Sequence, residues 1–202
     1  MLTIGVTGGT GAGKTSALRT FDRSGALALD CDAIYHELLA QDDALKAELE
    51  NAFHGVTGSD GKIDRKKLAA TVFKDEKMLQ ELNRITHKYI GREIERRLAS
   101  WERHGGAVAV IDAIALIESG RSKSCDIVIG VIAPLEKRLS RIMERDGITR
   151  ELARQRIDAQ KPDGFYRDNC TYILENNYDT AGEFEEECRV LYQWLLTEYG
   201  YV

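Results

Sequence analysis

Gly8-Gly9-Thr10-Gly11-Ala12-Gly13-Lys14-Thr15 is the stretch that decides the fold of this chain. It matches the P-loop pattern G-x-x-x-x-G-K-S/T at every fixed position. Residues 2–6, just before it, are typical of a short buried strand, and residues 16–21 begin a helix with Leu18 and Phe21 facing inward. Strand, loop and helix therefore follow one another in the order of a phosphate-binding loop. This context disfavours a glycine-rich turn that binds nothing.

The residue types of the loop suit a polyphosphate. At Gly8, Gly11 and Gly13 the missing Cβ lets the main chain curl closely enough for its N–H groups to surround phosphate oxygens. The next helix adds the partial positive charge of its N-terminus, Lys14 adds a full charge at the β- and γ-phosphates, and the Thr15 hydroxyl is the expected Mg²⁺ ligand. The residues expected to bind the nucleotide here are Gly9, Thr10, Gly11, Ala12, Gly13, Lys14, Thr15 and Ser16.

Composition narrows the class of protein. With 202 residues, 43% of them hydrophobic, the chain can bury a full core, and we expect one compact domain with insertions. A strand that begins by residue 2 and the lack of an apolar run of about 18 residues disfavour secretion and membrane insertion, so we expect a cytoplasmic protein. The net charge of −5 disfavours nucleic acid as a partner. The oligomeric state is left open.

Apolar runs predict four further strands, at residues 26–29, 107–111, 126–132 and 171–175. Helical segments separate them, so we predict an α/β fold with a five-stranded parallel sheet flanked by helices.

Acidic residues follow two of these strands. Asp30 and Asp32 come at the end of the second strand, where ligands of open α/β sheets are bound. We expect one of the two to cap the next helix, and leave open which of them contacts metal. Asp112 ends the third strand and is expected to hold Mg²⁺ directly or through water, with a structural role as the alternative.

Two long connections complete the predicted domain. Residues 33–104 form a helical insertion, with Met78, Leu82 and Ile85 on one apolar stripe, and residues 137 to about 165 form a lid. The core then consists of residues 1–32, 105–136 and 166–202.

The lid prediction rests on a concentration of positive charge. Residues 137–161 contain eight basic and four acidic residues, although the chain as a whole is acidic. Arg138, Arg141 and Arg145 follow one another at helical spacing on the polar face of the predicted helix, and guanidinium groups grip phosphate oxygens in pairs. A second helix is expected from Thr149 to about Gln160.

Together these parts indicate a P-loop kinase of a small molecule. Phosphoryl transfer requires positioning and charge neutralisation, which the loop, the carboxylates, the insertion and the arginines can supply. A regulatory GTPase fits less well, because no Asn-Lys-x-Asp motif follows the later strands.

Over essentially its whole length the chain resembles the dephospho-CoA kinase family. The matching segments are residues 5–15, Asp30-Cys31-Asp32, Ile85-Thr86-His87, residues 138–147, Arg156-Ile157 with Gln160, and Ile173-Leu174-Glu175-Asn176. The resemblance implies transfer of the ATP γ-phosphate to the ribose 3′-hydroxyl of dephospho-CoA, the last step of coenzyme A synthesis. It thus implies ATP and Mg²⁺ as cofactors and a nucleoside monophosphate kinase-like architecture.

The resemblance also implies roles for individual residues. Asp32 would accept the proton of the acceptor hydroxyl or orient that hydroxyl group. Lys14 and Thr15 would hold the phosphates and Mg²⁺. Arg141 and Arg145 would neutralise the transferring group. The remaining implied contacts are Asn176 near adenine, and Asp32, His87 and Asp112 on the acceptor.

Two departures from the family lie on the acceptor side. The usual His-Pro pair is His87-Lys88 here, and the usual Asp-Val-Pro-Leu-Leu-Phe-Glu run is Asp112-Ala113-Ile114-Ala115-Leu116-Ile117-Glu118. They leave two alternatives open: a related P-loop kinase of another nucleoside or nucleotide, and a non-catalytic nucleotide-binding protein.

Overall fold

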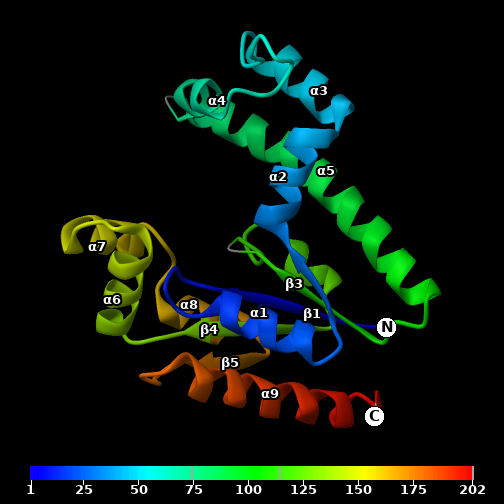
Figure 1. Ribbon diagram of the computed structural model, residues 1–202, viewed down its shortest axis with the longest axis vertical. Helices are drawn as coiled ribbons and strands as arrows, with labels where there is room; N and C mark the ends of the chain where they lie inside the picture. Colours follow the sequence, from blue (N-terminus) through cyan, green and yellow to red (C-terminus); the bar gives the residue numbers. More distant parts are fainter. Residues whose placement is uncertain (74, 114, 202) are drawn as a thin grey trace. The chain divides into compact units, whose positions relative to one another are not determined.

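The computed structural model describes residues 1–73, 75–113 and 115–201 (Figure 1). The chain divides into two compact units. One comprises residues 1–29 and 101–202, and the other residues 30–100. We call them the core unit and the helical unit.

Five strands form one parallel sheet, as predicted. They are β1 (Leu2–Gly8), β2 (Leu27–Asp30), β3 (Val108–Asp112), β4 (Ile127–Ile132) and β5 (Tyr172–Glu175). Their order in the sheet is β2-β3-β1-β4-β5. Every residue of β1 and β4 is buried, which is typical of central strands in a parallel sheet covered on both faces.

The core unit contains six helical segments among its described residues. They are α1 (Lys14–Arg23), η1 (Arg121–Ser124), α6 (Leu135–Asp146), α7 (Arg150–Asp158), α8 (Asp163–Asn169) and α9 (Ala181–Glu198). Of these, α8 is absent from the sequence prediction, which ends its second lid helix near Gln160.

Helices cover both faces of the sheet. Ile4 and Val6 of β1 point to the same core as α1 and α9, where Phe21 stacks on Tyr192 with ring centroids 5.4 Å apart. On the opposite face, a Cβ at Gly130 would lie 3.3 Å from the Cβ of Tyr166, so α8 packs against β4 there. Strand alternation therefore gives each face its own apolar layer.

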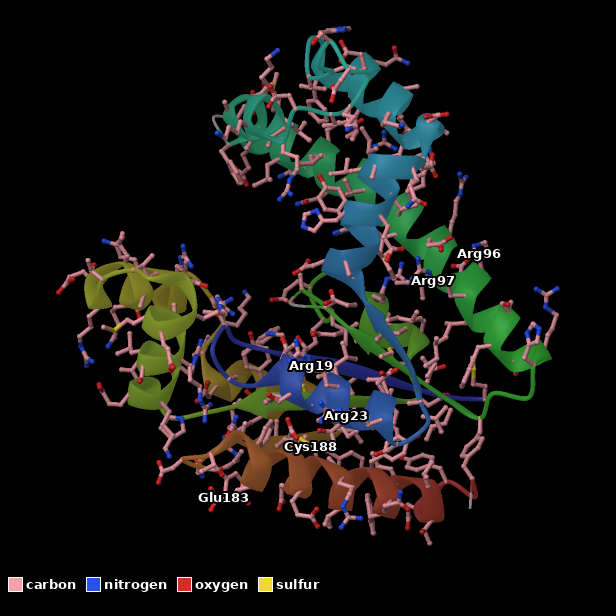
Figure 2. The ribbon with its side chains drawn as sticks, viewed as in Figure 1. Arg19, Arg23, Arg96, Arg97, Glu183 and Cys188 are labelled. Carbon is pink, nitrogen blue, oxygen red and sulfur yellow. The ribbon has the colours of Figure 1, made fainter. Side chains whose placement is uncertain are left out.

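The last helix, α9, is fixed at its start and along one side. Thr180 and Glu183 form a capping box. Phe184, Cys188 and Leu195 are buried, and Figure 2 shows Cys188 on the side of α9 that faces α1.

The helical unit consists of α2 (Cys31–Gln41), α3 (Asp43–Phe53), α4 (Arg65–Val72) and most of α5 (Glu76–Arg103). It has its own hydrophobic core, to which α5 contributes Leu79, Leu82, Ile85 and Tyr89. The prediction for Met78 was wrong, because its side chain is 39% exposed. The apolar residues of α5 that pack against this core begin one residue later, at the partly buried Leu79.

A membrane-spanning segment is not found in the described part of the chain, since none of its helices combines sufficient length with sufficient apolar character.

Candidate active site

The glycine-rich loop connects β1 to α1 in the conformation that the motif predicts. Gly8 and Gly13 have φ values of 141° and 116°, which residues with a Cβ rarely adopt. A Cβ at Gly8 would lie 2.1 Å from the carbonyl oxygen of Val131, and one at Gly13 would lie 2.4 Å from Nδ2 of Asn176. Both positions therefore require glycine for conformation and for space.

The N-terminus of α1 opens onto this loop. The helix begins at Lys14, and its N-cap residue Gly13 supplies no side-chain acceptor for the first N–H groups. The Lys14 ammonium group donates to the carbonyl oxygen of Gly8 at 2.9 Å and to that of Gly9 at 3.4 Å. Thr15 is exposed and Ser16 half-buried. Backbone donors and a cation at a helix start are the elements of an anion site.

Asn176 and Arg141 pack against the back of the loop. The buried amide of Asn176 donates to the carbonyl oxygen of Ala12 at 2.9 Å and accepts from Nη2 of Arg141 at 3.0 Å. Arg141 also donates to the carbonyl oxygens of Gly11 at 3.3 Å and Tyr178 at 3.1 Å. Burial lowers the pKa of the Arg141 guanidinium group.

The three arginines predicted on one polar face of α6 have different environments. Arg138 is 5% exposed, contrary to that prediction, because its guanidinium group lies against the glycine-rich loop. Arg145 is exposed and donates to both carboxylate oxygens of Asp146, at 2.7 and 2.9 Å, which raises the pKa of Arg145. Arg156 of α7 binds the same carboxylate.

Asp30 and Asp32 have different contacts at the start of α2. Oδ1 of Asp30 accepts from the N–H groups of Asp32 at 2.9 Å and Ala33 at 3.1 Å, so Asp30 is the capping residue. The Asp32 side chain is exposed in the first turn of the helix. The capping function expected of one carboxylate thus belongs to Asp30.

Asp112 lies at the end of β3, beside the end of β1. The strand register pairs it with Val6, two residues before the glycine-rich loop begins. Its Oδ1 atom is buried.

His87 is exposed in the middle of α5, in the helical unit. The neighbouring Lys88 forms an ion pair with Glu48 of α3 at 2.7 Å, and the Tyr89 hydroxyl donates to the same carboxylate oxygen at 2.8 Å. Lys88 thus has a structural partner within its own unit. In the second departure from the family, Ile114 lies outside the described residues.

The structure divides the predicted site residues between its units. The core unit brings together the glycine-rich loop, Lys14, Arg141 and Asn176, and Asp112 ends the strand next to β1. Asp32 and His87 belong to the helical unit. Sequence reasoning assigned no function to Gln160, whose side chain accepts the N–H of Thr10 at 2.7 Å. The available signal was its place in the segment Arg156-Ile157 with Gln160, which matches the family.

A five-stranded parallel sheet with a glycine-rich loop after β1 and flanking helices defines the class of P-loop nucleotide-binding proteins. Within that class, the family model for dephospho-CoA kinase matches residues 2–182. The chain belongs to the dephospho-CoA kinase family.

Individual relatives agree with this assignment. A dephospho-CoA kinase of Corynebacterium glutamicum is 36% identical over 178 residues, which is 88% of this chain and 91% of that protein. The crystal structure of TT1252 from Thermus thermophilus is 30% identical, covers 98% of this chain and 97% of its own, and superposes with a TM-score of 0.81. A dephospho-CoA kinase from Campylobacter jejuni is 25% identical, covers 95% and 96%, and has a TM-score of 0.63.

Proposed function

We propose that this kinase transfers the γ-phosphate of ATP to the ribose 3′-hydroxyl of dephospho-CoA and so forms coenzyme A. The observation that carries the proposal is a complete glycine-rich loop at the start of α1, in a chain of the dephospho-CoA kinase family. In the proposal, residues 9–16 surround the triphosphate, with Lys14 and backbone N–H groups of the loop and of the first turn of α1 as donors. The Thr10 N–H is not one of these donors, because it donates to Gln160. Asn176 lies behind Ala12 and Gly13 and is proposed on the adenine side.

The residues near the loop fit a magnesium ion. Mg²⁺ prefers oxygen ligands and usually keeps several waters besides one or two protein groups and substrate phosphates. Thr15 offers an exposed hydroxyl, and Asp112 offers a carboxylate at the neighbouring strand end. When bound, the ion neutralises charge on the transferring phosphates.

Asp32 is the proposed catalytic carboxylate. Asp30 is committed to two backbone N–H groups, whereas the Asp32 side chain is exposed. In the proposal Asp32 accepts the proton of the 3′-hydroxyl or orients that group towards the γ-phosphate. His87 and Asp112 contact the acceptor, with Asp112 thus serving acceptor and metal.

Arg141 and Arg145 are proposed to stabilise the charge on the transferring phosphoryl group. The two arginines differ in the contacts that each must break before its guanidinium group can reach the phosphoryl group. Arg145 holds a solvent-accessible ion pair with Asp146, and such pairs contribute little to stability. Arg141 would exchange hydrogen bonds to Gly11, Asn176 and Tyr178. Arg145 therefore needs the smaller rearrangement.

A coupled assay of ADP release tests the proposal, with dephospho-CoA, coenzyme A, AMP and a set of nucleosides as acceptors. We expect turnover with dephospho-CoA and none with coenzyme A, because the product already carries the 3′-phosphate. Turnover of another nucleoside without dephospho-CoA would favour a different acceptor. Binding of ATP without any turnover would favour a non-catalytic protein.

A further inference from the structure

Two side chains from the lid segment hold the peptide groups of Thr10 in the glycine-rich loop. Nε of Arg138 donates to the Thr10 carbonyl oxygen at 2.9 Å, and the Thr10 N–H donates to Oε1 of Gln160 at 2.7 Å. Nη2 of Arg138 also donates to Oε1 of Gln160, at 3.2 Å. The three residues therefore form a closed ring of hydrogen bonds.

We propose that Gln160 is a positioning residue for nucleotide binding. With Arg138 it fixes the backbone of Thr10 so that the loop is already shaped for a polyphosphate before the nucleotide arrives. This inference rests on the proposed nucleotide site.

The sequence of the loop supports a built contact with Arg138. Gly9 is a variable position of the P-loop pattern, so phosphate binding alone does not demand glycine there. A Cβ at Gly9 would lie 2.3 Å from Nη2 and 2.7 Å from Cζ of Arg138. One at Gly11 would lie 2.8 Å from the Arg138 carbonyl oxygen. The absence of a Cβ at Gly9 and Gly11 thus leaves the space that Arg138 occupies beside the loop.

Because Arg138 is buried, it needs the hydrogen-bond acceptor that Gln160 provides. A buried guanidinium group is costly unless acceptors surround it. Arg138 has the Thr10 carbonyl oxygen, Oε1 of Gln160 and, more distantly, the Asp163 carboxylate at 3.6 Å. Oε1 of Gln160 accepts hydrogen bonds from two donors, the Arg138 guanidinium group and the Thr10 N–H. A side chain at this position must therefore provide an acceptor oxygen to satisfy both donors.

Glycine neighbours also explain why Thr10 needs support. Gly9 and Gly11 restrict the backbone little, so an unsupported loop would have to be ordered when the nucleotide binds. Supporting contacts made beforehand reduce that entropic cost and so increase affinity. Removal of the Gln160 amide should therefore weaken nucleotide binding more than it slows the chemical step.

Four variants of the 202-residue chain test this. Gln160→Ala removes the acceptor, and Gln160→Asn keeps the amide but shortens its reach by one methylene. Gln160→Glu keeps an oxygen at the same reach and can accept from both donors. Arg154→Ala is the matched control, because Arg154 pairs only with Asp158 on the exposed side of α7 among the described residues.

The readouts are the Kd of a non-hydrolysable ATP analogue, the melting temperature, and kcat and KM for ATP and dephospho-CoA. We expect Gln160→Ala and Gln160→Asn to raise the Kd and the KM for ATP about tenfold. The KM for dephospho-CoA and kcat should stay near wild type, whereas the melting temperature should fall, because Arg138 and the Thr10 N–H lose an acceptor. Arg154→Ala should remain within about threefold of wild-type Kd, and Gln160→Glu should keep a melting temperature near wild type, because its carboxylate can still accept from both donors.

Wild-type nucleotide affinity in Gln160→Ala and Gln160→Asn would overturn the inference, as would equal weakening by Arg154→Ala. The binding arm requires no acceptor, so failure of dephospho-CoA as substrate would overturn the proposed reaction and leave the role of Gln160 standing. Wild-type protein that bound no ATP analogue would overturn both.

Discussion

At the scale of single residues, the start of α2 assigns the capping role, which the sequence left open between two carboxylates, to Asp30. Asp32→Asn should lower kcat by about 10²–10⁴-fold and change ATP affinity little, because a general base or hydroxyl-orienting group acts in the transition state. Single-turnover and steady-state rates with ATP and dephospho-CoA measure this effect.

Asp30→Asn is the matched control for that variant. Asparagine caps helices about as well as aspartate, so both N–H groups of α2 should keep their acceptor. We expect a small change in kcat and in melting temperature. If Asp30→Asn abolished turnover while Asp32→Asn remained active, the catalytic role would belong to Asp30.

Glu93 of α5 gives a residue-scale prediction about pH. Hydrogen bonds from Arg96, followed by those from Arg97, lower the pKa of Glu93 to about 2 against burial, which acts in the opposite direction. Arg97 also pairs with Glu37 of α2, and Figure 2 shows Arg96 and Arg97 on successive positions of α5. A lowered folded pKa means that the stabilisation is complete above the unfolded pKa and is lost as pH falls towards 2.

At pH 6, wild type should therefore have a higher melting temperature than Glu93→Gln. This difference in melting temperature should shrink between about pH 4.5 and pH 2. Melting curves of both proteins across that range provide the measurement. A difference that grew as pH fell would contradict the sign.

At the scale of elements, α6 and α7 form one packed hairpin. Leu139, Ile142, Ala153 and Ile157 make its small core. Arg138 near the start and Gln160 just after the end are both bound to Thr10. The base of the predicted lid is thus attached to the glycine-rich loop, while its exposed arginines lie further along the hairpin.

Addition of a non-hydrolysable ATP analogue should increase hydrogen-exchange protection mainly at residues 144–151 and in the glycine-rich loop. Surface ion pairs such as Arg145–Asp146 and Arg150–Glu136 hold the arginines only weakly, and a polyphosphate offers them stronger acceptors. Residues near Arg138 should change little. Equal protection of residues 144–151 with and without the analogue would count against a lid.

Elements were predicted better than the contacts between them. All five strands lie within two residues of their predicted bounds, because apolar runs in a parallel sheet end where the strand leaves the core. Helical periodicity placed Arg138 with Arg141 on a polar face. Periodicity contains no information about contacts distant in sequence, such as the hydrogen bond from Arg138 to the carbonyl oxygen of Thr10, 128 residues earlier, beside Gly9. The partner of Gln160 was hidden for the same reason.

At the scale of the whole molecule, the two compact units carry different parts of the proposed site. The core unit contains the glycine-rich loop and the residues that support it, and is proposed to bind the phosphates of ATP. The helical unit contains Asp32 and His87, and has a separate hydrophobic core. Substitutions in the glycine-rich loop should therefore affect ATP, whereas substitution of His87 should affect the acceptor.

Substitution of Lys88 tests whether the His87-Lys88 departure from the family affects binding of the acceptor. A lysine here could have met the diphosphate of dephospho-CoA, but its ammonium group is paired with Glu48, which links α5 to α3. Lys88→Ala should cost about 1 kcal/mol of stability or less and change the KM for dephospho-CoA less than threefold. A large increase in that KM would show that Lys88 leaves Glu48 for the acceptor.

His87→Ala should raise the KM for dephospho-CoA and leave both kcat and the Kd of an ATP analogue near wild type. The reason is that a contact made equally in the ground and transition states contributes uniform binding, and its loss appears in KM. Lys14→Ala provides the opposite case, because it removes a cation from the phosphate loop and should weaken ATP binding. Steady-state kinetics with each substrate varied at saturating levels of the other, together with direct binding of the analogue, separate the two effects. An equal loss of ATP affinity in His87→Ala would mean that the helical unit takes part in nucleotide binding, and the division of the substrates between the units would have to be abandoned.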